Sequence, residues 1–199
     1  MEKKYDKQLH IRTVGLREWR NNDAKKYNRY EATPYEALEV LLNSYKAPEN
    51  SKLVDFGSGR GRVAFFFHDK LHIPVTGIEA NDKTFEEALK NKMTYRRKRS
   101  HINAPITFEY ALAEQYEIQH DDNLFYFFNP FSVQIFKRVV NNIIHSLKEQ
   151  ERMADIILYY PLPDFVHLLK RHTPFKKINK VRVKGVHGKY GKFSIFRYS

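Results

Sequence analysis

Cysteine is absent from this chain, which excludes disulfides, thiolate metal ligands and cysteine nucleophiles. Long apolar runs are absent as well, and none approaches the roughly 20 residues that a membrane-spanning helix needs. The first six residues are mostly charged and contain no apolar signal core. We therefore expect a cytoplasmic protein that needs no membrane and no disulfide framework.

A metal-binding cluster is also absent. His68 and His72 have the spacing of the H-E-x-x-H zinc pair, but Asp69 replaces the glutamate and no third ligand is evident. No serine lies in a nucleophile-elbow pattern. The sequence therefore predicts no metal and gives no support for covalent hydrolase chemistry.

Glycine is scarce, with 8 residues in a chain of 199, yet three of them fall between residues 57 and 61. They follow a short apolar strand, 52–56, that carries Asp55 near its end. Such a turn brings backbone close to a ligand and leads into a helix N-terminus. About 20 residues later, Glu79 ends a second apolar strand, 74–79. A glycine turn followed by an acid at this distance is typical of a nucleoside site on a doubly wound sheet.

The glycine spacing distinguishes between two classes of nucleoside site. Dinucleotide-binding folds use G-x-G-x-x-G, and Arg62 occupies the position of the third glycine. The pattern here is D-x-G-x-G-x-G, and Asn129-Pro130-Phe131 follows a later strand. Together these residues resemble the motifs of class I S-adenosylmethionine-dependent methyltransferases over about residues 34–199. A nicotinamide-dependent oxidoreductase remains a less favoured alternative because of Arg62.

The order of predicted elements gives the fold class. We expect an α/β protein, a Rossmann-like doubly wound, mostly parallel seven-stranded sheet with helices on both faces and a C-terminal antiparallel hairpin. Thr33 and Glu36 predict a capped helix start that runs to about residue 45. The predicted strands are 52–56, 74–79, 105–110, 124–128, 155–160, 176–184 and 191–198, the last two flanking a turn at 185–188. The later predicted helices follow Gly61 or span 83–98, about 136–147 and 163–171.

Two segments follow from this division: residues 1–32 as an N-terminal extension or cofactor lid, and residues 33–199 as the methyltransferase domain. The extension is polar and rich in tyrosine. Tyr27, Tyr30 and Tyr35 are candidates for covering the cofactor, because aromatic faces attract a sulfonium cation.

The resemblance implies S-adenosyl-L-methionine as the cofactor and assigns residues to it. Gly57, Ser58 and Gly59 would lie against the methionyl part and the ribose, while Asp55 would hold the turn and the cofactor's amino group. Glu79 would accept both ribose hydroxyls with its two oxygens. The remaining assignments are Ala80 and Asn81 beside the adenine, Glu114 as a late substitute for the acid that often follows strand three, and Gly61 in the turn.

Asn129, Pro130 and Phe131 are the predicted catalytic residues. They resemble the Asn/Asp-Pro-Pro-aromatic motif of methyltransferases that act on planar nitrogen, with the second proline missing. In that motif the amide and a carbonyl accept hydrogen bonds from the target amine, and the aromatic ring stacks on the target. The resemblance implies a nitrogen acceptor beside the methyl group.

The formal net charge is +12, and basic residues concentrate at 90–99 and 176–197. Such surfaces attract nucleic acid, so RNA is a candidate partner. We expect methyl transfer to RNA, protein or a small molecule. The alternative is a non-catalytic module on the same fold that binds nucleic acid or a partner protein.

Overall fold

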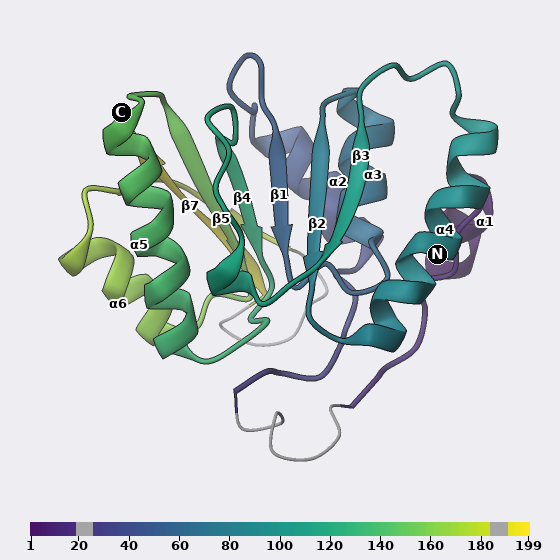
Figure 1. The fold of residues 1–199 in the computed structure, drawn as a ribbon, viewed down its shortest axis with the longest axis horizontal. Helices are drawn as coiled ribbons and strands as arrows, with labels where there is room; N and C mark the ends of the chain where they lie inside the picture. The colour runs from purple at the N-terminus through teal and green to yellow at the C-terminus, as the bar shows by residue number, and fades with distance from the viewer. Residues whose placement is uncertain (19–25, 184–190) are drawn as a thin grey trace.

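A single seven-stranded sheet organises the molecule, with helices on both of its faces (Figure 1). The computed structural model describes residues 1–18, 26–183 and 191–199. The strand order is β3-β2-β1-β4-β5-β7-β6, and β7 is antiparallel to both of its neighbours. The α/β fold class, the mostly parallel sheet and the antiparallel hairpin at its end are therefore confirmed.

The element bounds lie close to those predicted from the apolar patterns. The strands are β1 (Leu53–Phe56), β2 (Val75–Glu79), β3 (Ile106–Tyr110), β4 (Leu124–Phe127), β5 (Ala154–Tyr159), β6 (Lys176–Arg182) and β7 (Lys192–Tyr198). The helices are α1 (Glu2–Leu9), α2 (Tyr35–Ser44), α3 (Arg62–Leu71), α4 (Asp82–Lys98), α5 (Val133–Glu149) and α6 (Pro163–His172), with a short 3-10 turn, η2 (Ala113–Gln115). The predicted turn at 185–188 lies outside the described residues.

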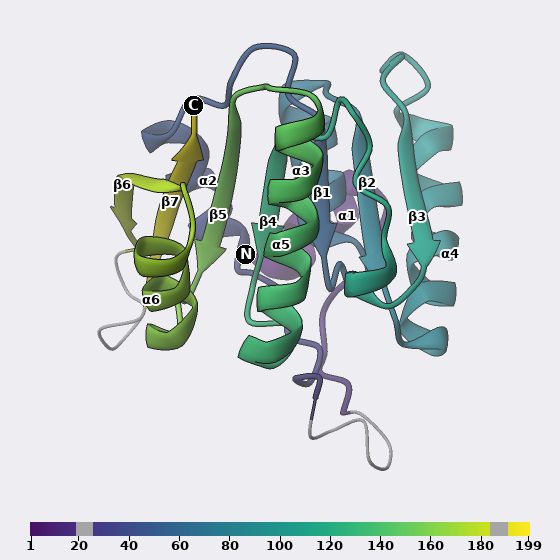
Figure 2. The same ribbon diagram turned by 60° about the vertical axis from the view of Figure 1, so that its left-hand side comes forward.

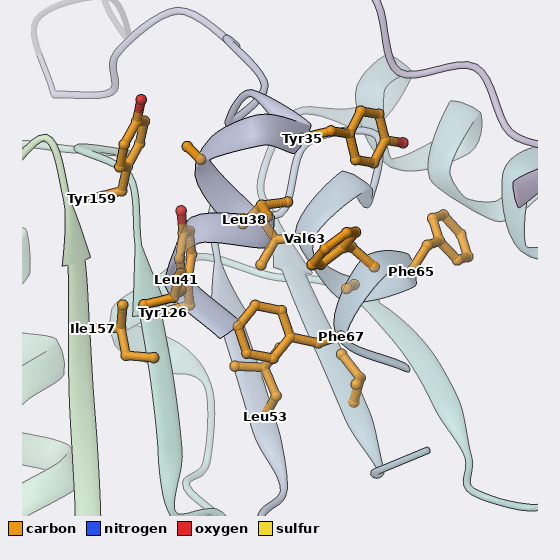
Figure 3. Close-up of a cluster of buried hydrophobic side chains, with 14 of the residues drawn as sticks. Tyr35, Leu38, Leu41, Leu53, Val63, Phe65, Phe67, Tyr126, Ile157 and Tyr159 are labelled. Atoms are coloured by element: carbon orange, nitrogen blue, oxygen red, sulfur yellow. The ribbon is translucent and has the colours of Figure 1, made fainter. Parts of the chain in front are cut away.

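Two hydrophobic layers sandwich the sheet. Residues of α1, α2, α3 and α4 pack against one face, where Leu38, Phe67 and Tyr126 are among the buried side chains (Figure 3). Residues of α5 and α6 pack against the other face, which Figure 2 brings forward. The central strands β1, β4 and β5 are buried along their whole length. Burial on both faces accounts for the continuous apolar sequence of β4, and β1 and β5 are apolar apart from one buried aspartate each, Asp55 and Asp155.

Within the described residues, no helix combines the length and the apolar character needed to cross a membrane.

The start of α2 corrects one sequence prediction. Thr33 does not cap the helix, because its hydroxyl hydrogen bonds to the Tyr126 hydroxyl at 2.8 Å. Instead, the Glu2 carboxylate accepts from the Tyr35 N–H at 3.2 Å. Glu2 belongs to α1, a helix that the polar sequence of residues 1–32 did not predict. The cap is thus supplied by a residue distant in sequence.

Candidate functional site

A pocket opens where β1, β2 and β4 end. The carboxyl ends of parallel strands meet at one edge of a sheet, and ligands of such folds bind there. The empty space in and around the pocket is about 810 Å³, part of which is open solvent. Its lining includes Asp55, Gly57, Ser58, Glu79, Ala80 and Asn81 from the predicted cofactor set, and Pro130 and Phe131 from the predicted catalytic set.

The glycine turn uses its own amides for internal hydrogen bonds. The N–H groups of Gly57 and Ser58 both donate to the Ile78 carbonyl at 2.9 Å. The Gly59 N–H donates to Glu79 Oε2 at 2.8 Å, and the Gly61 N–H donates to the Ser58 carbonyl at 2.8 Å. The backbone of this turn can therefore lie close to a ligand, but these four N–H groups already have hydrogen-bond partners within the protein.

Glu79 ties the glycine turn to the end of β2. Besides the Gly59 N–H, its carboxylate accepts the Asn81 N–H, which lies 2.7 Å from Oε1. Burial raises the pKa of the Glu79 carboxyl, and these backbone donors oppose the shift. Each oxygen keeps a second lone pair for a ligand hydroxyl. Glu79 therefore stabilises the glycine turn and is also a candidate hydrogen-bond acceptor for a ligand.

Asp55 contributes a second buried carboxyl group, with the residue only 3% exposed. Its Oδ2 has no hydrogen-bond partner among the described residues. Burial and the nearby charge of Glu79 raise the pKa of Asp55 to about 8, against the pull of the Ala64 N–H at the start of α3. A buried acceptor without a partner is costly. Asp55 is thus suited to a cationic or hydrogen-donating ligand.

The polar side chains of this pocket disfavour a pyrophosphate ligand and fit an amino acid group. Two buried carboxyls near the start of α3 would repel a phosphate there, although helix N-termini ordinarily attract one. Two more pocket atoms are buried and lack partners among the described residues, Ser58 Oγ and Arg17 Nε. An ammonium group could pair with Asp55, and a ligand carboxylate with Arg17. These residues fit the amino acid end of S-adenosylmethionine.

Three members of the predicted cofactor set lie outside the pocket lining. Gly61 faces Phe65 and Phe108, and a Cβ there would come within 2.6 Å of the Phe108 ring, so this glycine permits α3 to pack on the sheet. Gly59 lies under the ring of Tyr30. Glu114 sits in η2, where its Oε1 accepts from Arg138 at 2.9 Å. The structure does not bring Glu114 to the other residues.

Residues 13–17 and 26–33 lie across the pocket, and we refer to them as the roof segment. The ring of Tyr30 covers Gly59, and its hydroxyl donates to the Thr13 carbonyl at 2.7 Å. Tyr27 also lines the pocket. Tyr35, the third predicted lid residue, is fully buried and stacks on Tyr5 with 4.6 Å between ring centroids. Tyr35 is therefore part of the core.

Arg62, the residue that replaces the third glycine, anchors the N-terminal region. Its guanidinium pairs with the Glu2 carboxylate and donates to Thr13 Oγ1 at 2.7 Å and to the Thr33 carbonyl at 3.1 Å. It also lies over the Tyr35 ring, 4.5 Å from the centroid. The residue is 4% exposed. One buried cation thus holds α1 and both ends of the roof segment against α3.

Asn129, Pro130 and Phe131 form the loop after β4, which we call the acceptor loop. Pro130 and Phe131 line the pocket, and Asn129 lies outside its lining. The backbone N–H of Asn28 donates to the Pro130 carbonyl at 3.0 Å, and Asn28 Nδ2 donates to the Asn129 carbonyl at 2.6 Å. Asn129 Nδ2 donates to the Tyr160 carbonyl at 2.8 Å. Phe131 is buried against Phe127, so its ring is held in the core. Both carbonyls of this loop already accept hydrogen bonds from the roof segment.

Sequence reasoning missed Arg17, Thr33, Tyr126 and Asn28 as neighbours of the site. Arg17 and Asn28 lie in polar sequence without periodicity, and no local pattern marks them. Tyr126 is the partner of Asp55 in the β1–β4 register, and this pairing is visible only once the strand order is known. Among the described residues, no group of three or more histidine, aspartate or glutamate side chains could hold a metal ion.

Comparisons with solved structures find the same fold in several methyltransferases. The tRNA (uracil-54, C5)-methyltransferase of Pyrococcus abyssi, solved with S-adenosyl-L-homocysteine, matches over 82% of this chain with a TM-score of 0.58 and 14% identity. This chain spans only 38% of that protein. The RNA methyltransferase of Salinibacter ruber, also solved with S-adenosyl-L-homocysteine, matches over 84% of this chain and 92% of its own length, with a TM-score of 0.54 and 14% identity.

A human methyltransferase 10 domain containing protein matches over 98% of this chain and 91% of its own length, with a TM-score of 0.62 and 12% identity. No protein-family model and no curated protein sequence matches the chain. At such low identity, the likeness establishes the fold.

Proposed function

We propose that this chain, which has the fold of class I S-adenosylmethionine-dependent methyltransferases, binds S-adenosylmethionine in the described pocket and transfers its methyl group. The observation that carries the proposal is Asp55 Oδ2, a buried acceptor without a partner among the described residues, beside a turn whose amides are occupied. That combination favours a cationic ligand over a dinucleotide. The alternative of an oxidoreductase is correspondingly weaker.

The assignment of residues to the cofactor follows from their chemistry. Asp55 and Ser58 Oγ would receive the amino group, and Arg17 Nε the carboxylate. Glu79 would accept ribose hydroxyls through its remaining lone pairs. Ala80 and Asn81 line the pocket beyond Glu79 and would flank the adenine.

When bound, S-adenosylmethionine supplies a methyl carbon activated by the adjacent sulfonium. The chain's own contribution is to hold the acceptor in line with that carbon, because positioning alone removes much of the entropic barrier. Asn129 and Pro130 would orient a nitrogen acceptor through their oxygens. In this structure Asn28 already donates to the backbone carbonyls of Asn129 and Pro130. A nitrogen acceptor would therefore have to displace Asn28 or bond to the side chain of Asn129.

The roof segment would act as the lid over the cofactor. Tyr30 and Tyr27 come from this segment and line the pocket, and its contacts with Gly59 and Pro130 join it to both halves of the site. RNA, protein and small molecules are the candidate methyl acceptors. The names of two structural neighbours favour RNA, and the non-catalytic alternative is not favoured by neighbours named as methyltransferases.

The test is calorimetry with S-adenosylhomocysteine, with NAD and NADP as controls, followed by transfer of labelled methyl groups from S-adenosylmethionine into fractionated RNA, protein and metabolites. We expect binding of the first ligand alone and label in one fraction. Asn129→Ala should retain S-adenosylhomocysteine affinity within about twofold and reduce turnover by on the order of 100-fold, the effect of lost positioning. Equal binding of NAD would contradict the cofactor proposal, and unchanged turnover in the variant would contradict the role of Asn129.

The raised pKa of Asp55 leads to a second prediction. With a pKa of about 8 in the ligand-free protein, Asp55 is mostly protonated at a pH of about 6.5, whereas pairing with an ammonium group requires the carboxylate. Ligand binding should therefore release nearly one proton at that pH, about half a proton at pH 8 and progressively less above it. Calorimetry in two buffers with different ionisation enthalpies measures the number released.

The same pKa shift fixes the sign of a stability effect. The folded pKa lies above the unfolded value, so the folded protein binds more protons between about pH 4 and pH 8. Asp55 therefore makes the free energy of unfolding fall as pH rises through that range, with no further loss above it. Asp55→Asn should flatten this part of the curve. No proton release by the wild-type protein, together with an unchanged curve in the variant, would refute the assignment.

A further inference from the structure

Figure 2 shows α6 beside the β6–β7 hairpin at one edge of the sheet, and these elements carry several lysines and arginines. We call five of these residues the basic corner: Lys170, Lys177, Lys180, Arg182 and Lys192. Four of these residues are exposed, and Lys192 is partly buried. Within the described ranges, no ion pair to an acidic side chain involves Lys170, Lys177, Lys180 or Arg182.

The strand register places four of these cations on one face. Lys177, Lys180 and Arg182 lie opposite Phe196, Ser194 and Lys192, respectively, in the antiparallel ladder. Opposite residues share a face, and successive residues of β7 alternate between faces. Phe196 packs into the core layer formed by α5 and α6, so all four cations project on the side of α6.

A β-bulge between Lys177 and Asn179 makes this alignment possible. Lys177 and Lys180 are three positions apart, and a regular strand would put them on opposite faces. The extra residue restores them to the same face, as bulges often re-aim a side chain. Lys177 Nζ then lies 6.0 Å from the Phe196 ring centroid. The result is a row of cations about 15 Å long, at about 3.3 Å per residue.

The cations of the row lie close enough to repel one another. Arg182 lies directly opposite Lys192 in the ladder, a position in which like charges repel. Burial lowers the pKa of the Lys177 amine, and the charges of Lys170, Lys180 and Lys192 add to the effect. A polyanion laid along the row would relieve the repulsion.

The basic corner begins beside the predicted acceptor loop. The Lys192 carbonyl accepts the Tyr160 N–H at 3.0 Å, and the Tyr160 carbonyl accepts Asn129 Nδ2 at 2.8 Å. A single residue, Tyr160, thus separates the start of β7 from the acceptor loop. A ligand that follows the row therefore passes from the site to the edge of the sheet.

We propose that the basic corner binds the phosphate backbone of a nucleic acid that extends from the pocket. A linear row of cations matches a linear polyanion better than a single phosphate group, and backbone contacts of this kind bind without reading sequence. That the bound nucleic acid is also the methyl acceptor rests on the proposed function. Binding of the nucleic-acid phosphate backbone to the basic corner does not depend on the proposed function.

The experiment is fluorescence anisotropy of a labelled RNA of about 20 nucleotides, and of DNA of the same sequence, over about 50 to 200 mM salt. The test variant is Lys177→Gln with Lys180→Gln. Each phosphate contact to a single strand contributes a slope of about 0.7 in log affinity against log salt, or roughly fivefold at 0.1 M. We expect the variant to bind about 25-fold more weakly, with a slope lower by about 1.4.

The matched control is Arg97→Gln with Lys98→Gln, two exposed cations at the end of α4. It removes the same charge and should change affinity by less than about threefold. Equal losses in both variants, no nucleic-acid binding by the wild-type chain, or equal binding of polyglutamate would each overturn the proposal. Calorimetry with S-adenosylhomocysteine on the same variants separates the two proposals, because neither variant touches the pocket.

Discussion

Replacement of Gly57 by alanine should reduce S-adenosylhomocysteine affinity by at least about 100-fold, the scale of a few kcal/mol in binding. Gly57 has φ of +74°, a conformation that side chains rarely adopt. Its added Cβ would also overlap Cβ of Pro130. The turn and the acceptor loop would have to separate, and the pocket between them would change shape. Calorimetry measures the loss of affinity.

Gly15→Ala is the matched control for this prediction. Gly15 also has a positive φ, +109°, but its added Cβ would meet only the flexible end of Arg60 at 3.2 Å. The substitution therefore strains the roof segment without a close contact to the glycine turn or the acceptor loop. We expect its ligand affinity to fall clearly less than that of Gly57→Ala, by no more than about tenfold, because only the roof segment would shift. Similar losses in both variants would mean that strain, and not the close approach at Gly57, controls binding.

Replacement of Arg62 by methionine should destabilise the folded protein by about 3–5 kcal/mol, the typical cost of removing one partner from a buried ion pair. The Glu2 carboxylate would lose its cation, and Thr13 Oγ1 and the Thr33 carbonyl would lose their donor. These partners tie α1 and the roof segment to α3. The variant should therefore lose stability as a whole and also lose hydrogen-exchange protection in α1 and the roof segment. Denaturant unfolding measures the first effect, and hydrogen exchange over residues 1–18 and 26–33 measures the second.

Arg138→Met provides the comparison on the surface. Arg138 pairs with Glu114 at 2.9 Å, but its side chain is 58% exposed, and exposed pairs contribute about 0–1 kcal/mol. A cost for Arg62→Met no larger than that of Arg138→Met would show that the Arg62 network does not hold the N-terminal region. If the Arg62 variant keeps hydrogen-exchange protection in the sheet but loses it in α1 and the roof segment, the predicted local effect would be supported.

The sheet and the pocket residues at the ends of β1 and β2 were predictable because their signals are local. Buried parallel strands such as β4 must be apolar throughout, and the glycine turn must follow β1 directly. The position of Glu79 at the end of the next strand, β2, was predictable for the same reason. These features depend on residues that are neighbours in sequence.

The roof and the acceptor loop depend on contacts that no local pattern encodes. The helix α1 buries only Asp6 and Leu9, so its sequence has no apolar stripe. Asp6 is stabilised inside by Thr13 and Tyr35, which donate to its carboxylate at 2.6 to 2.7 Å. Likewise, Thr33 has the residue type of a cap but is bonded to Tyr126. Long-range polar pairing overrides propensity in each case.

The Arg62 network has a consequence for the order of events during synthesis. Glu2, Thr13 and Thr33 are synthesised before Arg62, so α1 and the roof segment lack this anchor until α3 has been made. Docking of this segment has to wait for α3, and for Asn91 on α4, whose side chain holds the backbone of Arg12. Contacts between such distant residues form late, because chain entropy must first be lost. Residues 1–18 and 26–33 would then be among the last to fold although they are made before α3, and the pocket would gain its roof only after the sheet beneath it.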